Sequence, residues 1–339
     1  MFGKLMNRYY YGKAGKGDFT PEDLPKNRWQ LFWEMLRVRF TGLVKLNLLY
    51  MLCWIPVMIV LGLGFLSLYA QLSEVATLQE QVELGEALQS DLDTLQGSLN
   101  GNLLSLLSTT LLLLWPCITI TGPFTAGAAY VTRNWARDEH SFMLSDFWSA
   151  VKGNWKQALL TSFITGALPF LMYVCISFYG QMAQSNMIFI IPEVLIIMLG
   201  LIWMCSLMYM YPQMITYKLN FRGLVRNSFL MTLGRLPHTV GLKLLSLLPA
   251  LILAFFMLFT SIGIYVLLVY ALYYLLLGFA LSRFVGASFA NGVFDKYINS
   301  KMEGVEVGRG LYTETDEDED EEESETPALH EADEEQAEP

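Results

Sequence analysis

Long apolar runs are the feature that most constrains how this chain can fold. They cover residues 43–68, 103–122, 158–179, 187–211 and 240–285. A helix needs roughly 20 mostly apolar residues to cross a bilayer, so each of the first four runs predicts one membrane-spanning helix. The last run is long enough for two helices, near residues 240–259 and 263–285, with a tight turn predicted at Thr260, Ser261 and Gly263. The sequence therefore predicts an all-α polytopic membrane protein with six spans.

Composition agrees with this class. Hydrophobic residues make up 54% of the 339 residues, whereas soluble domains contain about 45–50% apolar residues. The net charge of −10 is misleading, because 15 of the 32 Asp and Glu residues lie between residues 314 and 338. Such a block of like charge cannot bury enough apolar surface to fold. We therefore expect residues 300–339 to form a disordered acidic tail.

The basic residues lie on one side of the predicted spans. All 22 Lys and Arg residues fall within residues 4–45, 133–156, 218–243 and 283–309, and none falls within residues 71–102. Because Lys and Arg concentrate in cytoplasmic loops, this distribution predicts a multi-pass plasma-membrane protein with both termini in the cytoplasm. The expected organisation is an N-terminal segment (1–27), a membrane domain (28–299) and the tail.

Several segments outside the spans also have helical patterns. Aromatic and basic residues occur together before the first, third and fifth spans, in residues 32–40, 147–155 and 220–236. This composition is typical of amphipathic helices that lie in the headgroup layer. The segment 71–102 carries leucines at i, i+4, i+7 and i+11, which predicts an extracytoplasmic helical hairpin continuous with the first two spans.

The second span contains an unusual break. Two prolines predict a kink or an unwound stretch, because proline frees a backbone carbonyl that neighbouring groups must satisfy. Small residues follow the break and allow another helix to approach closely. We interpret the stretch as a helix-packing joint formed by Pro116, Thr121, Gly122, Pro123, Ala126 and Gly127. The alternative is that Thr121 caps a half-helix whose N–H groups face an anionic substrate, as in some transporters.

Charged residues near the spans offer two further candidate sites. Glu193 is the single acid within a span, and it is either a functional intramembrane group or an interfacial carboxylate near the outer face. Arg133, Arg137, Asp138 and Glu139 follow the packing joint. In one interpretation the arginines contact lipid phosphates while the acids pair with the arginines or cap the next helix. In the other, the four residues form a docking surface for a cytoplasmic partner.

Catalytic patterns are missing from the sequence. The three histidines, His140, His238 and His330, have no metal-ligand spacing, and the four cysteines lie in apolar runs. No fingerprint of a serine hydrolase, zinc protease, phosphate-binding loop or dinucleotide site occurs. We therefore expect no enzymatic activity, no cofactor, no metal and no nucleic-acid partner.

Four sequence stretches resemble a known family. TITGPFTAGAAYVTRNWARDE and the following DFWSAVKGNWKQA carry the resemblance, with support from LVKLNLLYMLCWIPV and the closing NGVFDKYIN. They are similar to the YesL-like family, bacterial integral membrane proteins with a domain of unknown function. Genes of that family often lie beside carbohydrate ABC transporters and polysaccharide-degrading enzymes. The resemblance covers residues 31–299 and implies an accessory role in sugar uptake.

Two functions follow from these patterns. The first is an accessory or scaffold protein of the bacterial plasma membrane, which binds the bilayer and the membrane subunits of a carbohydrate ABC transporter or its regulator. The alternative is a small-solute transporter or channel that uses the proline-broken helices. A polar cavity between the spans would distinguish the second function from the first.

Overall fold

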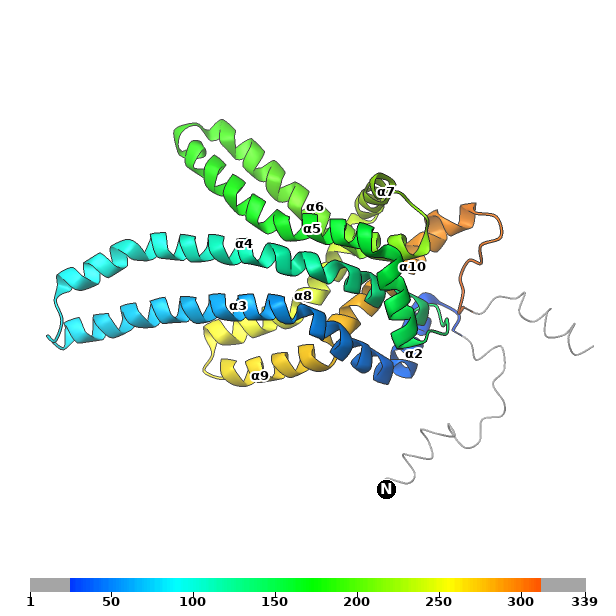
Figure 1. Ribbon diagram of the computed structural model, residues 1–339, viewed down its shortest axis with the longest axis horizontal. Helices are drawn as coiled ribbons and strands as arrows, with labels where there is room; N and C mark the ends of the chain where they lie inside the picture. Colours follow the sequence, from blue (N-terminus) through cyan, green and yellow to red (C-terminus); the bar gives the residue numbers. More distant parts are fainter. Residues whose placement is uncertain (1–24, 312–339) are drawn as a thin grey trace, which may run out of the picture.

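The computed structural model describes residues 25–311, and this part of the chain contains helices and no strand (Figure 1). The helices are α2 Arg28–Val38, α3 Phe40–Glu83, α4 Gln89–Trp135, α5 Met143–Ser185, η2 Met187–Phe189, α6 Ile190–Thr216, α7 Phe221–Gly234, α8 Leu236–Phe259, α9 Gly263–Tyr273, η3 Tyr274–Gly278, α10 Phe279–Tyr297 and η4 Asn299–Lys301. The predicted all-α fold is confirmed. Most of the predicted N-terminal segment and the acidic stretch from residue 314 lie outside the described residues.

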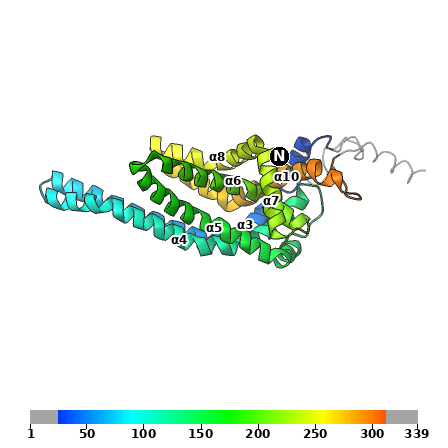
Figure 2. The same ribbon diagram turned by 90° about the horizontal axis from the view of Figure 1, so that it is seen from above.

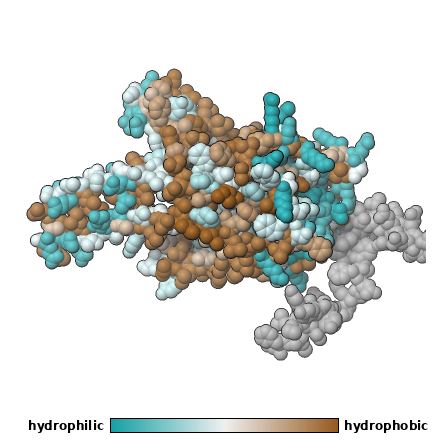
Figure 3. Space-filling model, viewed as in Figure 1, coloured by the Kyte–Doolittle hydropathy of each residue, from teal (hydrophilic) through white to brown (hydrophobic). Residues whose placement is uncertain are grey.

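Within residues 25–311, six helical segments are long and apolar enough to cross a membrane, which confirms the predicted number of spans. They are Phe40–Glu83, Gln89–Trp135, Met143–Ser185, Met187–Thr216, Leu236–Phe259 and Gly263–Lys301. At most 22% of the most apolar window of each segment is buried inside the protein. The apolar side chains therefore face outward, where Figure 3 shows a broad hydrophobic surface for a bilayer to cover.

The first two spans continue well beyond the membrane-crossing length. Helix α3 has 44 residues and α4 has 47, so each is roughly 65–70 Å long, about twice the thickness of a hydrocarbon core. The two helices lie side by side and project past the others at one end (Figures 1 and 2). They are joined by a turn in which Gly85 has a φ of +76°, a conformation that glycine adopts without strain. Residues 71–102 are thus almost wholly helical.

Two of the three predicted amphipathic segments are separate helices. Asn27 begins α2 by accepting hydrogen bonds from the N–H groups of Trp29 and Gln30. Asn220 begins α7 in the same way, by accepting one from Gly223. Residues 147–155 differ, because they belong to the single helix α5. No proline occurs between residue 143 and Pro169, so nothing separates this segment from its span.

The sequence predicted a kink or an unwound stretch in the second span, and the helix does not unwind there. Helix α4 is continuous from Gln89 to Trp135, with Pro116 and Pro123 both inside it. The sixth span has the irregularity instead. Its first part, α9, passes through the π-helical turn η3 before it continues as α10.

The buried core lies at the end opposite the α3–α4 projection (Figure 2). Helix α10 is central there, because it packs against α2, α3, α4 and α6. Phe147, Phe284 and Tyr50 are among the largest side chains that are fully buried. Hydrophilic residues also gather at this end, around α2 and α7 (Figure 3).

The boundary predicted for the tail is too early. Residues 300–311 follow α10 and fold back onto the helical body. Leu311 packs against the main apolar cluster, and Gly310 lies so close to the Arg137 carbonyl that a Cβ atom would be 3.0 Å from it. Gly308 and Gly310 both have positive φ angles, which explains how this segment turns back.

Candidate functional site

The small residues of the predicted packing joint face α5. A Cβ atom at Gly122 would collide with the Ser162 side chain and the Ala158 carbonyl. A Cβ atom at Gly127 would lie 2.8 Å from Val151 Cγ2. Helices α4 and α5 therefore touch along this stretch, and these residues leave no small-residue surface for another protein.

The carbonyl freed by Pro123 has a partner on α5. In a regular helix the N–H of residue 123 would donate to the Thr119 carbonyl, but proline has no N–H. The Ser162 hydroxyl lies 2.6 Å from that carbonyl and donates to it. Threonines of the same helix have other partners: Thr119 and Thr121 donate to the carbonyls of Trp115 and Ile118.

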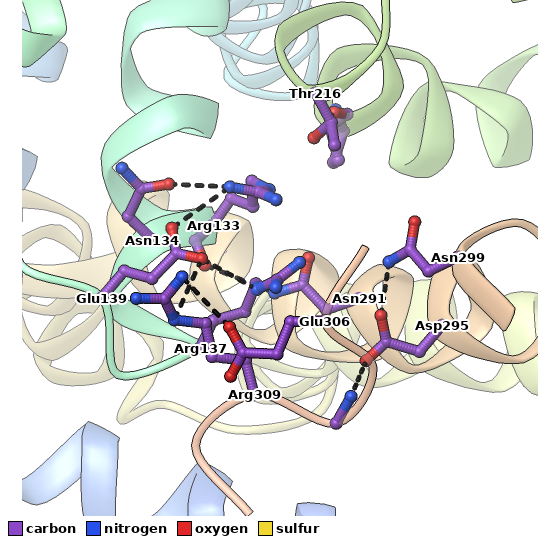
Figure 4. Close-up of polar contacts among 12 residues, drawn as sticks. Arg133, Asn134, Arg137, Glu139, Thr216, Asn291, Asp295, Asn299, Glu306 and Arg309 are labelled. Atoms are coloured by element: carbon purple, nitrogen blue, oxygen red, sulfur yellow. Dashed lines mark hydrogen bonds and ion pairs between the residues drawn. The ribbon is translucent and has the colours of Figure 1, made fainter. Parts of the chain in front are cut away.

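The predicted docking residues form an ion cluster around Glu139 (Figure 4). Its carboxylate lies 3.3 Å from Arg133, 3.1 Å from Arg137 and 3.7 Å from Arg309. The Arg137 side chain is only 7% exposed. These residues therefore connect the end of α4 to the segment after α10 within the protein.

Asp138 is the exposed member of the predicted docking set. It lies 3.6 Å from Arg39, at the start of the first span. Its φ of +56° marks a sharp turn after α4. Of the four residues, only Asp138 is exposed, and its carboxylate is paired with Arg39.

A second polar cluster surrounds Asp295 of α10, which is 5% exposed (Figure 4). Its carboxylate pairs with Arg28 of α2 and accepts hydrogen bonds from Asn299 and from the Gly308 N–H. Tyr217, after α6, donates to Asn299 at 2.6 Å. Burial raises the pKa of Tyr217 to about 12, so its phenol remains protonated and able to donate. Asp295 and Asn299 belong to the NGVFDKYIN stretch, and the sequence did not reveal their polar contacts.

A cavity of about 430 Å³ lies between the helices, beside the C-terminal part of α4, from Ile118 to Thr132. Side chains from α3, α4, α5, α6, α8, α9, η3 and α10 line it. Its volume falls within the range of small-molecule sites, about 300–1,000 Å³. Hydroxyl groups are frequent in its wall and come from Tyr50, Thr121, Thr125, Thr132, Ser162, Thr165, Tyr211, Ser246, Tyr273, Tyr274 and Ser282.

Two cations also line the cavity, Lys243 from α8 and Arg283 from α10. Arg283 donates to the Tyr50 hydroxyl at 3.4 Å, and its guanidinium lies 5.5 Å from the centre of the Tyr211 ring. Among the described residues, no carboxylate lies within 4.0 Å of either cation, and none lines the cavity. Within a membrane protein, ionisable residues of this kind mark candidate functional sites.

The irregular turn of the sixth span forms part of the same wall. A π turn leaves backbone groups without their usual helical partners, and such turns are frequent at functional sites. Asn47 of α3 compensates here: its amide donates to the carbonyls of Tyr274 and Leu275, at 2.9 and 2.8 Å. Its oxygen accepts from the Ala280 N–H at 2.9 Å. Asn47 therefore fixes η3, and with it the positions of the cavity tyrosines.

Glu193 lies apart from this site. It occupies the first turn of α6, is partly exposed, and does not line the cavity. A carboxylate at this position interacts favourably with the helix dipole.

Within residues 25–311, no group of His, Cys, Asp and Glu is placed to hold a metal ion.

Sequence reasoning missed Asn47, Lys243 and Arg283. The two cations were assigned to cytoplasmic segments because of their charge. Both nevertheless fall inside predicted spans, residues 240–259 and 263–285, and that position is a signal of an intramembrane polar site.

Comparison with known proteins gives one match. Residues 100–176 match the model of a family described as a protein of unknown function, DUF624. DUF624 is the family of YesL-type membrane proteins, so the match agrees with the sequence resemblance over these residues. The matched region includes the packing joint, Arg133, Arg137, Glu139 and Ser162, but not Arg309, Lys243 or Arg283. No curated protein and no solved structure matches the chain.

Proposed function

We propose that the protein is a small-solute transporter whose binding site is the cavity beside α4. The observation that carries this proposal is the pair of cations, Lys243 and Arg283, in a hydroxyl-rich cavity between candidate spans. Charged groups are costly inside a membrane and usually serve a substrate path or a partner. The π turn beside them gives the sixth span a point where its backbone departs from regular helix, as in transporters with discontinuous helices.

The accessory role in sugar uptake has less support from the geometry. Of the features that supported it, the small-residue helix face packs against α5, and Arg133 and Arg137 of the predicted docking set pair with Glu139. That role now rests on the family resemblance. By the same resemblance and the one-sided basic residues, we place the protein in a bacterial plasma membrane with cytoplasmic termini.

The proposal includes no catalytic step. The described cavity wall contains no Asp, Glu or His that could act as a general base toward one of its serine or threonine hydroxyls, and it contains no Cys. We therefore assign binding and passage, without chemical conversion, to this site.

Solvent access to the cavity from both membrane faces tests the proposal without knowledge of the solute. In a variant whose four cysteines are replaced, Ser246→Cys places a thiol on the cavity wall of α8, where the native hydroxyl bonds only its own helix. A charged, membrane-impermeant thiol reagent should label it in right-side-out and in inverted vesicles. Labelling from one face alone, or from neither, would refute transport.

Leu251→Cys is the matched control. Leu251 lies on the same helix, is 57% exposed and does not line the cavity. In a membrane this thiol should meet lipid and remain unlabelled from both faces.

If transport is refuted, affinity purification of the full chain from its native membrane should instead recover stoichiometric permease subunits of a sugar ABC transporter.

A further inference from the structure

Charge in the cavity indicates which solutes it can bind. Lys243 and Arg283 contribute positive charge from two different helices, and no described acidic residue lines the cavity. A neutral solute would leave both cations without a counter-charge in a region of low dielectric constant, which is unfavourable. An anionic group placed between them would form charge-assisted hydrogen bonds with both.

The groups around Arg283 hold the guanidinium in place. The Tyr50 hydroxyl accepts a hydrogen bond from Arg283, and the same hydroxyl oxygen lies 2.6 Å from the Thr125 hydroxyl oxygen. The Tyr211 ring lies beside the guanidinium. Tyr50 is 1% exposed and Tyr211 is 4% exposed, so both are fixed by packing. Neither neutralises Arg283, which remains available to an anion.

The remaining wall suits a hydroxylated body attached to the anionic group. Thr121 of α4 and Thr165 of α5 donate their protons to carbonyls of their own helices, so their oxygens can accept hydrogen bonds from hydroxyl groups of a ligand. Aromatic side chains such as Trp54 and Tyr273 add apolar surface on which a ring can pack. Pockets that combine apolar walls with a few convergent polar groups are typical ligand sites.

We infer that the cavity binds a phosphate or carboxylate group between Lys243 and Arg283, with the polar body of the ligand against α4 and α5. This inference rests on the proposed function, because it names the class of solute. The anionic group can belong to a free metabolite or to a lipid headgroup. In the transport proposal it belongs to a free, water-soluble anion.

Binding to the purified full chain in nanodiscs tests the inference. The probes are glucose 6-phosphate, inorganic phosphate and neutral glucose, in nanodiscs of phosphatidylcholine. Glucose 6-phosphate should bind and raise the melting temperature, while glucose alone should bind about tenfold more weakly or worse. Equal binding of glucose and glucose 6-phosphate would overturn the inference while leaving the cavity as a solute site.

Two cavity variants that remove charge, one substitution that conserves it and one control outside the cavity make the test specific. Arg283→Gln and Lys243→Gln should each weaken glucose 6-phosphate binding by about tenfold or more. Arg283→Lys keeps the charge and should recover part of the affinity. Lys152→Gln removes an exposed cation outside the cavity and should change the affinity less than twofold. Unchanged binding in both cavity variants would overturn the inference.

A second experiment, with an anionic lipid, distinguishes the two sources of the anion. If the cavity binds a lipid headgroup, nanodiscs of phosphatidylglycerol should raise the melting temperature of the unmodified chain but not that of Arg283→Gln. The soluble probes should then have no effect. That outcome would overturn the assignment of a free anion. Labelling of Ser246→Cys from both faces with no anion binding would likewise refute the inference while supporting transport.

Discussion

At the scale of single residues, Asn47 stabilises the only π turn within residues 25–311. Its side chain is fully buried and makes hydrogen bonds to two carbonyls and one N–H of the sixth span. We expect Asn47→Leu to lower the free energy of unfolding by about 1–3 kcal/mol, because buried backbone groups lose their partners. Chemical unfolding in detergent measures the difference.

Asn102→Leu is the control for this substitution. Asn102 is exposed on the projecting part of α4 and makes no described side-chain hydrogen bond. It should change stability by less than about 0.5 kcal/mol. Equal stability of the Asn47 and Asn102 variants would show that η3 persists without its amide partner.

Ser162 and Pro123 are coupled through one carbonyl. Ser162→Ala should destabilise the protein by about 1 kcal/mol, since the Thr119 carbonyl loses its donor. With Pro123→Ala in place, residue 123 has an N–H that can donate to that carbonyl, and the effect of Ser162→Ala should largely disappear. A double-mutant cycle measures this coupling, and purely additive effects would contradict the proposed pairing.

At the scale of elements, the interface between α4 and α5 depends on glycine. Gly127→Leu adds a side chain where even a Cβ atom would be 2.9 Å from the Phe147 carbonyl. We expect a loss of about 1–3 kcal/mol in stability from overpacking, measured by thermal unfolding in detergent. Gly97→Leu lies on the same helix, in a place where a Cβ atom meets nothing within 4 Å. It should be close to neutral, and equal losses in both variants would contradict the packing role of Gly127.

The sequence predicted helices well because apolar length determines what can cross a membrane. It did not predict the continuity of α4, because a distant serine supplies the hydrogen bond that makes Pro123 tolerable. The π turn was equally hidden, since Asn47 and Tyr274 are neighbours only after folding. The cavity was only partly visible in the sequence: Lys243 and Arg283 fall inside predicted spans, but packing is what places them around the same cavity.

At the scale of the whole molecule, the two ends differ in charge. The α3–α4 projection carries acidic residues and no Lys or Arg between residues 71 and 102. The opposite end holds α2, α7 and the arginines of the Glu139 cluster. Since cytoplasmic segments are rich in Lys and Arg, the projection should lie outside the cell and the buried core on the cytoplasmic side.

Two single cysteines in a cysteine-free chain test this orientation. Ser90→Cys lies at the exposed start of α4, and Ser300→Cys lies on the exposed turn after α10. An impermeant thiol reagent should label the first in intact cells and the second only after the cells are opened. The physical reason is the cost of moving charged segments across the bilayer, which leaves the basic end inside. Labelling of Ser300→Cys in intact cells would show the opposite orientation, in which the cavity cations lie nearer the outer face.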